Sequence, residues 1–303
     1  MVPIPHTFTR LPTCSLRVNI SALSEHRCHL GEGPLWDPLE EALYWIDSLA
    51  PMLYRHDFTS ASTDSWPLPG RTIGSLALRA SGGLILAMDQ GLYLFDPENG
   101  DLESIAQPLA GKEGLRLNDG KVDPFGYFVT GAMNIDFQQK LPGSMYRLSP
   151  DFEVTEILDG FSCFNGPCFS ASGDRLYLTG RDESAIEVFD YGRDVLPTNG
   201  QVFHANCSPD GATVDAEGYL WSAQWDEACI IRIAPDGNID RRIAVPGQVV
   251  SSVTFGGPKL DLIYVTTTGG EVQGVVPGAA QPGRVLVISG TGCHGRAEPS
   301  FIG

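Results

Sequence analysis

Six copies of one composite pattern run through the 303-residue chain, and this repetition constrains its fold more than any other feature. Each copy has an apolar run, a turn with Gly or Pro, a strand-like run with Tyr or Trp, and a further strand-like run. A repeat of about 40 to 50 residues with room for four short strands is typical of β-propeller blades. The copies begin with GEGPLWDP (31–38), GSLALRAS (74–81), NDGKVDPF (118–125), NGPCFSAS (165–172), PDGATVDA (209–216) and SSVTFGGP (251–258).

The composition agrees with an all-β fold. The chain has 35 glycines and 22 prolines, and short β-branched and aromatic runs recur between them, whereas no long stretch keeps an apolar period of 3.6 residues. An all-β sandwich would also show regular strands and turns. Six copies of one pattern favour a six-bladed β-propeller, formed by residues 1–303 as a single domain, with the first 25 or so residues less clearly part of it.

Charge and termini bear on partners and location. The formal net charge is −17, which argues against a surface for nucleic acid or anionic membranes, because such surfaces need clustered Lys and Arg. The first residues carry prolines where a signal peptide needs an apolar core, and no apolar run approaches the roughly 20 residues of a membrane span. Seven cysteines without regular spacing indicate reduced thiols. We therefore expect a cytoplasmic protein with no nucleic-acid or membrane partner, as a monomer or a homodimer.

A second layer of repetition locates a candidate site. The motif Val-Asp-x-x-Gly-Tyr occurs at 122–127 and again at 214–219. In a propeller the innermost strand of each blade runs along a central channel, so that equivalent positions at its start form a ring. Alignment of the six copies on this motif gives a ring of Glu32, Gly74, Asn118, Asn165, Asp210 and Ser251.

Four ring residues are followed by Gly or Asp-Gly. Such pairs are ordinary turn signals, and for any single copy turn chemistry explains them. Together, however, they bring Glu32 and Asp210 to one mouth of the channel. Two carboxylates in a narrow channel repel each other unless they are protonated or neutralised by a cation.

The ring therefore predicts a divalent metal site at that mouth. Carboxylate and amide oxygens suit a hard ion, which favours Ca²⁺ over Mg²⁺, Mn²⁺ or Zn²⁺. Three or four protein oxygens leave coordination positions for water and substrate. Arg116, two residues before Asn118, is expected at the same mouth, where it either holds a hydroxyl-rich substrate or pairs with a surface acid.

Several colinear segments resemble the gluconolactonase/regucalcin family, which is similar to senescence marker protein 30. These segments are GEGPLWDP with ALYWID, RLNDGKVDPFGYFVTGAMN, NGPCFSASGDRLY, PDGATVDAEGYLW and SSVTFGGPKLDLIYVTT, and they extend from about residue 30 to 268. The resemblance implies a six-bladed propeller that binds a divalent cation in its channel and hydrolyses sugar lactones.

The resemblance also implies roles for individual residues. Glu32, Asn165 and Asp210 correspond to the metal ligands of the family, and Arg116 and Asn118 to positions that contact substrate. Asp136 lies in a loosely matching segment where an acidic substrate contact is common.

One departure from the family pattern stands out. Gly180-Arg181 replaces a common Asp-Ser, which puts contacts at the substrate rim in question.

We thus expect a lactonase in which the cation polarises the lactone carbonyl and Asp210 is the general base for the attacking water. The sequence contains no GxSxG segment, which would indicate a covalent serine nucleophile. The alternatives are a phosphotriester hydrolase on the same scaffold and a calcium-binding regulatory protein without turnover.

Overall fold

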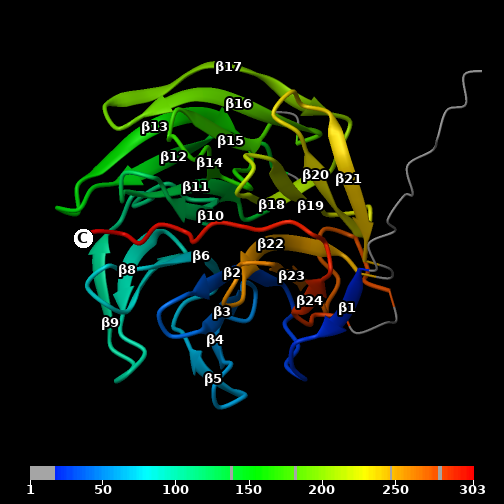
Figure 1. Ribbon diagram of the computed structural model, residues 1–303. Helices are drawn as coiled ribbons and strands as arrows, with labels where there is room; N and C mark the ends of the chain where they lie inside the picture. The colour runs from blue at the N-terminus through cyan, green and yellow to red at the C-terminus, as the bar shows by residue number, and fades with distance from the viewer. Residues whose placement is uncertain (1–17, 137–138, 181–182, 246–247, 279–281) are drawn as a thin grey trace, which may run out of the picture.

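The computed structural model describes residues 18–136, 139–180, 183–245, 248–278 and 282–303. Within these ranges the chain forms 24 strands in six four-stranded antiparallel sheets, arranged around a common centre (Figure 1). No helix in the described part of the chain is long and apolar enough to cross a membrane. The prediction of a six-bladed, all-β propeller is therefore confirmed.

Blades 1 to 5 each use four consecutive strands, and the sheet order follows the chain. Listed from the innermost strand outward, blade 1 is β2 (Gly31–Asp37), β3 (Ala42–Asp47), β4 (Met52–Asp57) and β5 (Ser62–Pro67). Blade 2 is β6 (Ile73–Leu78), β7 (Leu84–Met88), β8 (Gly91–Phe95) and β9 (Leu102–Ala106). Blade 3 is β10 (Leu115–Val122), β11 (Phe128–Asn134), β12 (Gly143–Leu148) and β13 (Val154–Phe161).

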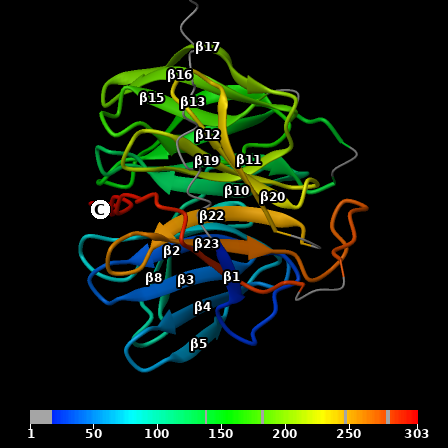
Figure 2. The same cartoon turned by 45° about the vertical axis from the view of Figure 1, so that its right-hand side comes forward.

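Blade 4 is β14 (Cys168–Phe169), β15 (Arg175–Thr179), β16 (Ala185–Gly192) and β17 (Val195–Ala205). Blade 5 is β18 (Pro209–Val214), β19 (Leu220–Gln224), β20 (Cys229–Ile233) and β21 (Ile239–Ala244). The innermost strands gather at the centre of the molecule, as β2, β10 and β22 show in two views (Figure 1 and Figure 2).

Blade 6 is completed by the other end of the chain. It consists of β22 (Val250–Gly256), β23 (Leu262–Thr267), β24 (Leu286–Ser289) and, as its outermost strand, β1 (Asn19–Ala22). In the β1–β24 pair Asn19 lies opposite Ser289 and Ala22 opposite Leu286. The N-terminal strand therefore closes the propeller by pairing with the last strand, although its sequence carries no repeat motif.

The repeated Val-Asp-x-x-Gly-Tyr motif forms the hairpin between the first two strands of a blade. Asp123 Oδ1 accepts the N–H groups of Phe125 (2.9 Å) and Tyr127 (3.0 Å). Asp215 Oδ1 accepts those of Glu217 (2.9 Å) and Tyr219 (3.0 Å) in the same way. Because an Asp side chain can satisfy the amides of a tight turn locally, this part of the fold is encoded within six residues.

The hydrophobic core is divided among the six junctions between neighbouring blades, each of which holds one cluster of buried side chains. At the junction of blades 2 and 3, for example, Ile85 packs in the same cluster as Phe128. Burial of a side chain of this size contributes about 1.5 to 3 kcal/mol. The packing fixes each blade against both neighbours and so fixes the width of the channel.

After β24 the chain runs across the face of the propeller toward blades 3 and 2 (Figure 1, red). We call residues 290–303 the C-terminal segment. It hydrogen-bonds to blade 5 through Ala216 N–H and His294 O (2.9 Å), and to blade 2 through Ala80 N–H and Phe301 O (2.8 Å). Phe301 is fully buried in the cluster between blades 2 and 3.

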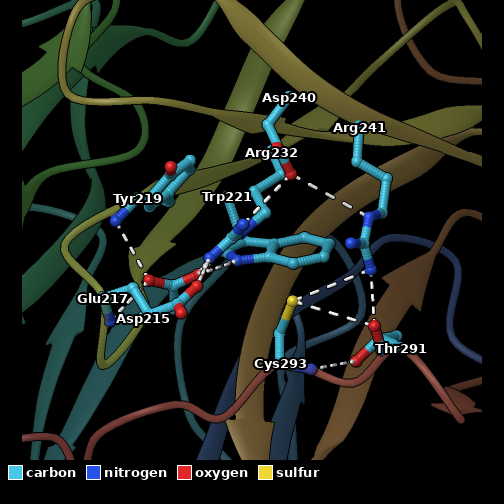
Figure 3. Close-up of polar contacts among 9 residues, drawn as sticks. All are labelled: Asp215, Glu217, Tyr219, Trp221, Arg232, Asp240, Arg241, Thr291 and Cys293. Atoms are coloured by element: carbon cyan, nitrogen blue, oxygen red, sulfur yellow. Dashed lines mark hydrogen bonds and ion pairs between the residues drawn. The ribbon is translucent and has the colours of Figure 1, made fainter. Parts of the chain in front are cut away.

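A charged network on blade 5 helps to anchor this segment (Figure 3). Arg232 is buried and pairs with three carboxylates, namely those of Asp215, Glu217 and Asp240. Beside it, Arg241 donates to the carbonyl oxygen of Thr291 in the C-terminal segment. Five charged side chains of the fifth copy of the repeat therefore take part in one network.

Candidate functional site

Breaks in strand register place the ring side chains in the channel. The inner strands of five blades each lose the regular pairing at or beside the ring position, which is where β-bulges redirect side chains. In β10 the break lies between Leu117 and Gly120, and in β18 it lies between Pro209 and Ala212. The corresponding breaks in β2, β6 and β22 fall between Glu32 and Leu35, Ile73 and Ser75, and Val250 and Ser252.

Two of the glycines that follow ring residues are required by close contacts. A Cβ atom on Gly166 would lie 2.5 Å from Asp210 O, and its φ of +59° suits glycine. A Cβ atom on Gly211 would lie 2.0 Å from Ser252 Oγ. These glycines allow the backbones of neighbouring blades to approach one another beside the ring.

A cavity of about 270 Å³ opens at this end of the channel. It is lined by five of the six predicted site residues, Glu32, Arg116, Asn118, Asn165 and Asp210. The structure thus brings together four of the six ring residues and Arg116, and their individual roles stay predictions.

The sixth predicted residue and two ring positions lie differently. Asp136 is exposed and does not line the cavity, but its Oδ2 accepts a hydrogen bond from Nε2 of Gln139, which does (3.3 Å). Ser251 is fully buried and donates to Gly31 O (2.5 Å), so its hydroxyl serves the contact between blades 6 and 1. At Gly74 a Cβ atom would lie 2.5 Å from Asn118 O, which accounts for the glycine in blade 2.

Hydrogen bonds fix the side chains of Arg116 and Asn118. Arg116 Nη1 donates to Asn118 Oδ1 (2.8 Å) and to Leu117 O (2.9 Å). Asn118 Nδ2 donates to Phe164 O (3.0 Å) and to Asn165 Oδ1. The amide of Asn118 therefore connects Arg116 on blade 3 to Asn165 on blade 4, and it orients the Asn165 oxygen.

Burial and mutual repulsion disfavour the charged forms of the two ring carboxylates. The pKa of Glu32 lies well above its usual range because the side chain is desolvated and because Asp210 and Asp119 are close. Burial also raises the pKa of Asp210, and the charge of Asp119 adds to the effect. Arg116 opposes both shifts, while burial lowers its own pKa.

This arrangement fits a divalent cation. Among the described residues, Glu32 and Asp210 have no ion-pair partner within 4 Å, so the nearby Arg116 does not neutralise them directly. A cation held by these two carboxylates and the Asn165 amide would remove the repulsion. The described part of the chain contains no group of three His, Cys, Asp or Glu side chains that could hold a metal. The candidate set combines two carboxylates with one amide oxygen.

The sequence did not identify Asp119 as a channel residue. Asp119 Oδ2 accepts the N–H of Gly166 (2.8 Å), and Oδ1 accepts that of Gly120 (2.8 Å). Because the register break in β10 removes the simple alternation of faces, the position of Asp119 next to a ring residue does not reveal which way it points. The Asn-Asp-Gly sequence was the only available signal, and it resembles an ordinary turn.

The rim of the cavity carries additional polar groups. Lys140 and Glu183, from loops of blades 3 and 4, form an ion pair (2.9 Å), and both line the cavity. Gly180 donates its N–H to Ala185 O (2.5 Å) in the hairpin between β15 and β16. Arg181, the other half of the departure noted in the sequence, lies outside the described residues.

Comparisons with known proteins agree on one family. The family model described as the SMP-30/Gluconolactonase/LRE-like region matches residues 30–269. A pentonolactonase of Haloferax volcanii is 32% identical over 262 residues, which are 85% of this chain and 88% of that protein. A 6-deoxy-6-sulfogluconolactonase of Pseudomonas putida is 32% identical over 244 residues, or 79% of this chain and 83% of that protein.

A solved structure supports the same assignment. The crystal structure of a calcium-binding protein, regucalcin, from Agrobacterium tumefaciens superposes with a TM-score of 0.84 at 28% identity, covering 92% of this chain and 96% of that one. The family model spans most of the chain, including every ring position. This chain is therefore a member of the SMP-30/gluconolactonase/LRE-like family.

Proposed function

We propose that this protein is a metal-dependent lactonase that hydrolyses a sugar lactone to the corresponding sugar acid. The observation that carries the proposal is the pair formed by part-buried Glu32 and buried Asp210, two carboxylates without an ion-pair partner among the described residues, in a cavity that Asn165 and Arg116 also line. The two curated relatives described above are named for lactone substrates, which supports the same reaction class.

In this proposal Glu32, Asn165 and Asp210 hold one divalent cation, with Ca²⁺ favoured by the oxygen donors. When bound, the cation supplies a Lewis acid that polarises the lactone carbonyl and stabilises the negative charge that develops on its oxygen. The cavity of about 270 Å³ is large enough for a five- or six-carbon lactone beside the ligands.

The residues of the chain then divide the remaining tasks. Asp210 accepts a proton from the attacking water, which adds to the carbonyl carbon. The ring C–O bond breaks, and the proton on Asp210 passes to the departing alkoxide, so that the first products are a carboxylic acid and a hydroxyl group of one open-chain sugar acid. The carboxylic acid then ionises and releases one proton to the solvent. Arg116 and Asn118 bind substrate oxygens in a fixed orientation, because their own hydrogen bonds restrict them.

The test is hydrolysis of a panel of aldonolactones, followed by proton release, on protein stripped with a chelator. Ca²⁺, Mg²⁺, Mn²⁺ and Zn²⁺ are added back one at a time. We expect turnover of one or two lactones only after an ion is restored. Full activity of the stripped protein would refute the metal role, and turnover of organophosphates alone would replace lactones by phosphotriesters as the substrate class.

A calcium-binding protein without turnover is the remaining outcome. It would appear as Ca²⁺ binding in a calorimeter with no hydrolysis of either panel. That result would refute the enzymatic proposal but leave the metal site standing.

A further inference from the structure

A part-buried ion pair lies in the channel on the side away from the cavity. Lys121 Nζ, near the end of β10, is 2.8 Å from Glu298 Oε1 in the C-terminal segment and donates to Ala212 O of blade 5 (3.0 Å). Thr213 Oγ1, on the same strand as Ala212, donates to the same glutamate oxygen (3.0 Å). The side chains of Lys121 and Glu298 are only 18% and 15% exposed, so neither belongs to the solvated surface.

This pair contacts the strand that carries Asp210. Asp210 and Gly211 lie inside the register break of β18, where the regular pairing with β19 is interrupted. Ala212 resumes that pairing, opposite Ser222. The carbonyl oxygen of Ala212 accepts a hydrogen bond from Lys121, and the hydroxyl of the next residue, Thr213, donates one to Glu298. Lys121 and Glu298 therefore stabilise the end of the bulge, and the bulge sets the direction of the Asp210 side chain.

Asp119 stabilises the backbone beside the ligand position on the neighbouring blade, Asn165. Its carboxylate accepts the N–H of Gly166, the residue after Asn165. Asp119 and Lys121 are two residues apart on β10, and Lys121 is one of the charges that lower the pKa of Asp119 against the effect of burial. One strand of blade 3 thus supports the ligand positions on blades 4 and 5.

The cavities show how close the C-terminal segment comes to the ring. A small cavity of about 30 Å³ is lined by Gly33, Asp119 and Ser252, each of which follows a ring residue, and also by Glu298 and Pro299. Glu298 is kept in this place by the burial of Phe301 three residues later and by the hydrogen bond from Ala80 N–H to Phe301 O. A glutamate from the end of the chain therefore completes the wall of the channel beneath the ligands.

We infer that Lys121 and Glu298 are positioning residues for the Asp210 side chain. The C-terminal segment, which supplies Glu298, therefore belongs to the functional site. This inference rests on the proposed function. Without Glu298, Lys121 would be a part-buried cation with no carboxylate within 4 Å among the described residues, and it would be drawn away from Ala212 toward water. The bulge that aims Asp210 would then lose its support from the channel side.

The test compares Glu298→Gln, Lys121→Met and the double variant with the wild-type protein. Ca²⁺ alone is titrated into each chelator-stripped protein in a calorimeter, and lactone kinetics are measured separately. Partners that orient metal ligands typically contribute 10- to 100-fold in affinity or activity. We expect the Kd for Ca²⁺ to rise about tenfold in each single variant, with a fall in kcat larger than the change in KM. Because both residues act through β18, the double variant should bind Ca²⁺ no more weakly than the single variant with the lower affinity.

Arg55→Met is a matched control. Arg55 also forms an ion pair of low exposure, with Asp57 at 3.2 Å and exposed fractions of 17% and 22%, but it lies on β4 of blade 1. We expect this variant to lower the melting temperature while its Kd for Ca²⁺ stays within twofold of the wild-type value. Equal losses of Ca²⁺ affinity in Arg55→Met and Glu298→Gln would overturn the inference, since the effect would then reflect general stability.

The remaining outcomes separate this inference from the proposed function. If Kd and kcat in both channel variants stay within twofold of wild type, the pair is structural only and the inference is wrong. If the variants lose Ca²⁺ affinity but the wild type hydrolyses no lactone, the positioning role stands and the proposed activity fails. A wild-type protein that binds no Ca²⁺ would overturn both.

Discussion

Removing the Asp215 carboxylate should destabilise the protein more than the same change at Asp123, although the two residues occupy equivalent positions in the repeated turn. Both carboxylates accept two backbone N–H groups of their own turn. The other oxygen differs between them. Asp123 Oδ2 accepts a hydrogen bond from the hydroxyl of Tyr191 (2.6 Å), whereas Asp215 Oδ2 accepts hydrogen bonds from Trp221 Nε1 (2.9 Å) and Arg232 Nε (2.8 Å).

The magnitude follows from these partners. Asp123→Ala loses three hydrogen bonds but no ion pair within 4 Å among the described residues, and at roughly 1 kcal/mol for each bond the cost is about 2 to 3 kcal/mol. Asp215→Ala also leaves Arg232, which is 4% exposed, without its fully buried partner. Breaking a buried pair from one side costs about 3 to 5 kcal/mol. The remaining partners of Arg232, Glu217 and Asp240, are more exposed and should hold the cost near the lower end of that range.

The assay is equilibrium unfolding in urea for the wild type and the two alanine variants. Both variants lose the same two turn hydrogen bonds, so the difference comes from the other carboxylate oxygen. A broken buried pair at about 3 kcal/mol replaces the Tyr191 hydrogen bond at about 1 kcal/mol, and we therefore expect Asp215→Ala to lose about 2 kcal/mol more than Asp123→Ala. The matching asparagine variants keep the acceptor for the turn and isolate the effect of the charge. Equal losses at the two positions would refute the reasoning, because the pair with Arg232 would then contribute no net stability.

Three further predictions concern the site and the pH dependence of stability. Asp210→Asn should retain part of the metal binding while kcat falls by about 10²- to 10⁴-fold, the usual contribution of a general base; full activity in this variant would remove Asp210 from that role. Arg116→Ala should mainly raise KM, by about tenfold or more for the loss of a charged hydrogen bond, whereas equal losses in kcat and kcat/KM would indicate a contact made only in the transition state. His56 is buried against Phe58, and burial lowers its pKa below the ordinary value, with Asp57 opposing the shift. The stability that it contributes is present above that ordinary value and is lost as the pH falls through the lowered pKa. The melting temperature of the wild type should therefore drop more between pH 7.5 and pH 5 than that of His56→Gln, and parallel curves would contradict this assignment.

The sequence by itself determined the architecture and five of the residues that line the cavity. Six copies of the pattern predict six blades, and the turn motif at 122–127 and 214–219 is explained by hydrogen bonds within six residues. Local chemistry of this kind can be recognised in a sequence because both partners of each bond lie in the same short segment. Registering the copies on that motif also placed Glu32, Asn118, Asn165 and Asp210 around one cavity.

Only the tertiary structure decided which ring side chains line the cavity and which distant residues contact the strands that carry them. Ser251 faces Gly31 of another blade, and this depends on contacts between residues 220 positions apart. Asp119 enters the channel because a register break changes the face of β10. The propeller is closed by β1, and the channel wall is completed by Glu298, which meets Lys121 across 177 positions. A repeat pattern specifies the blades one at a time, whereas these contacts exist only after all six blades have closed into a ring.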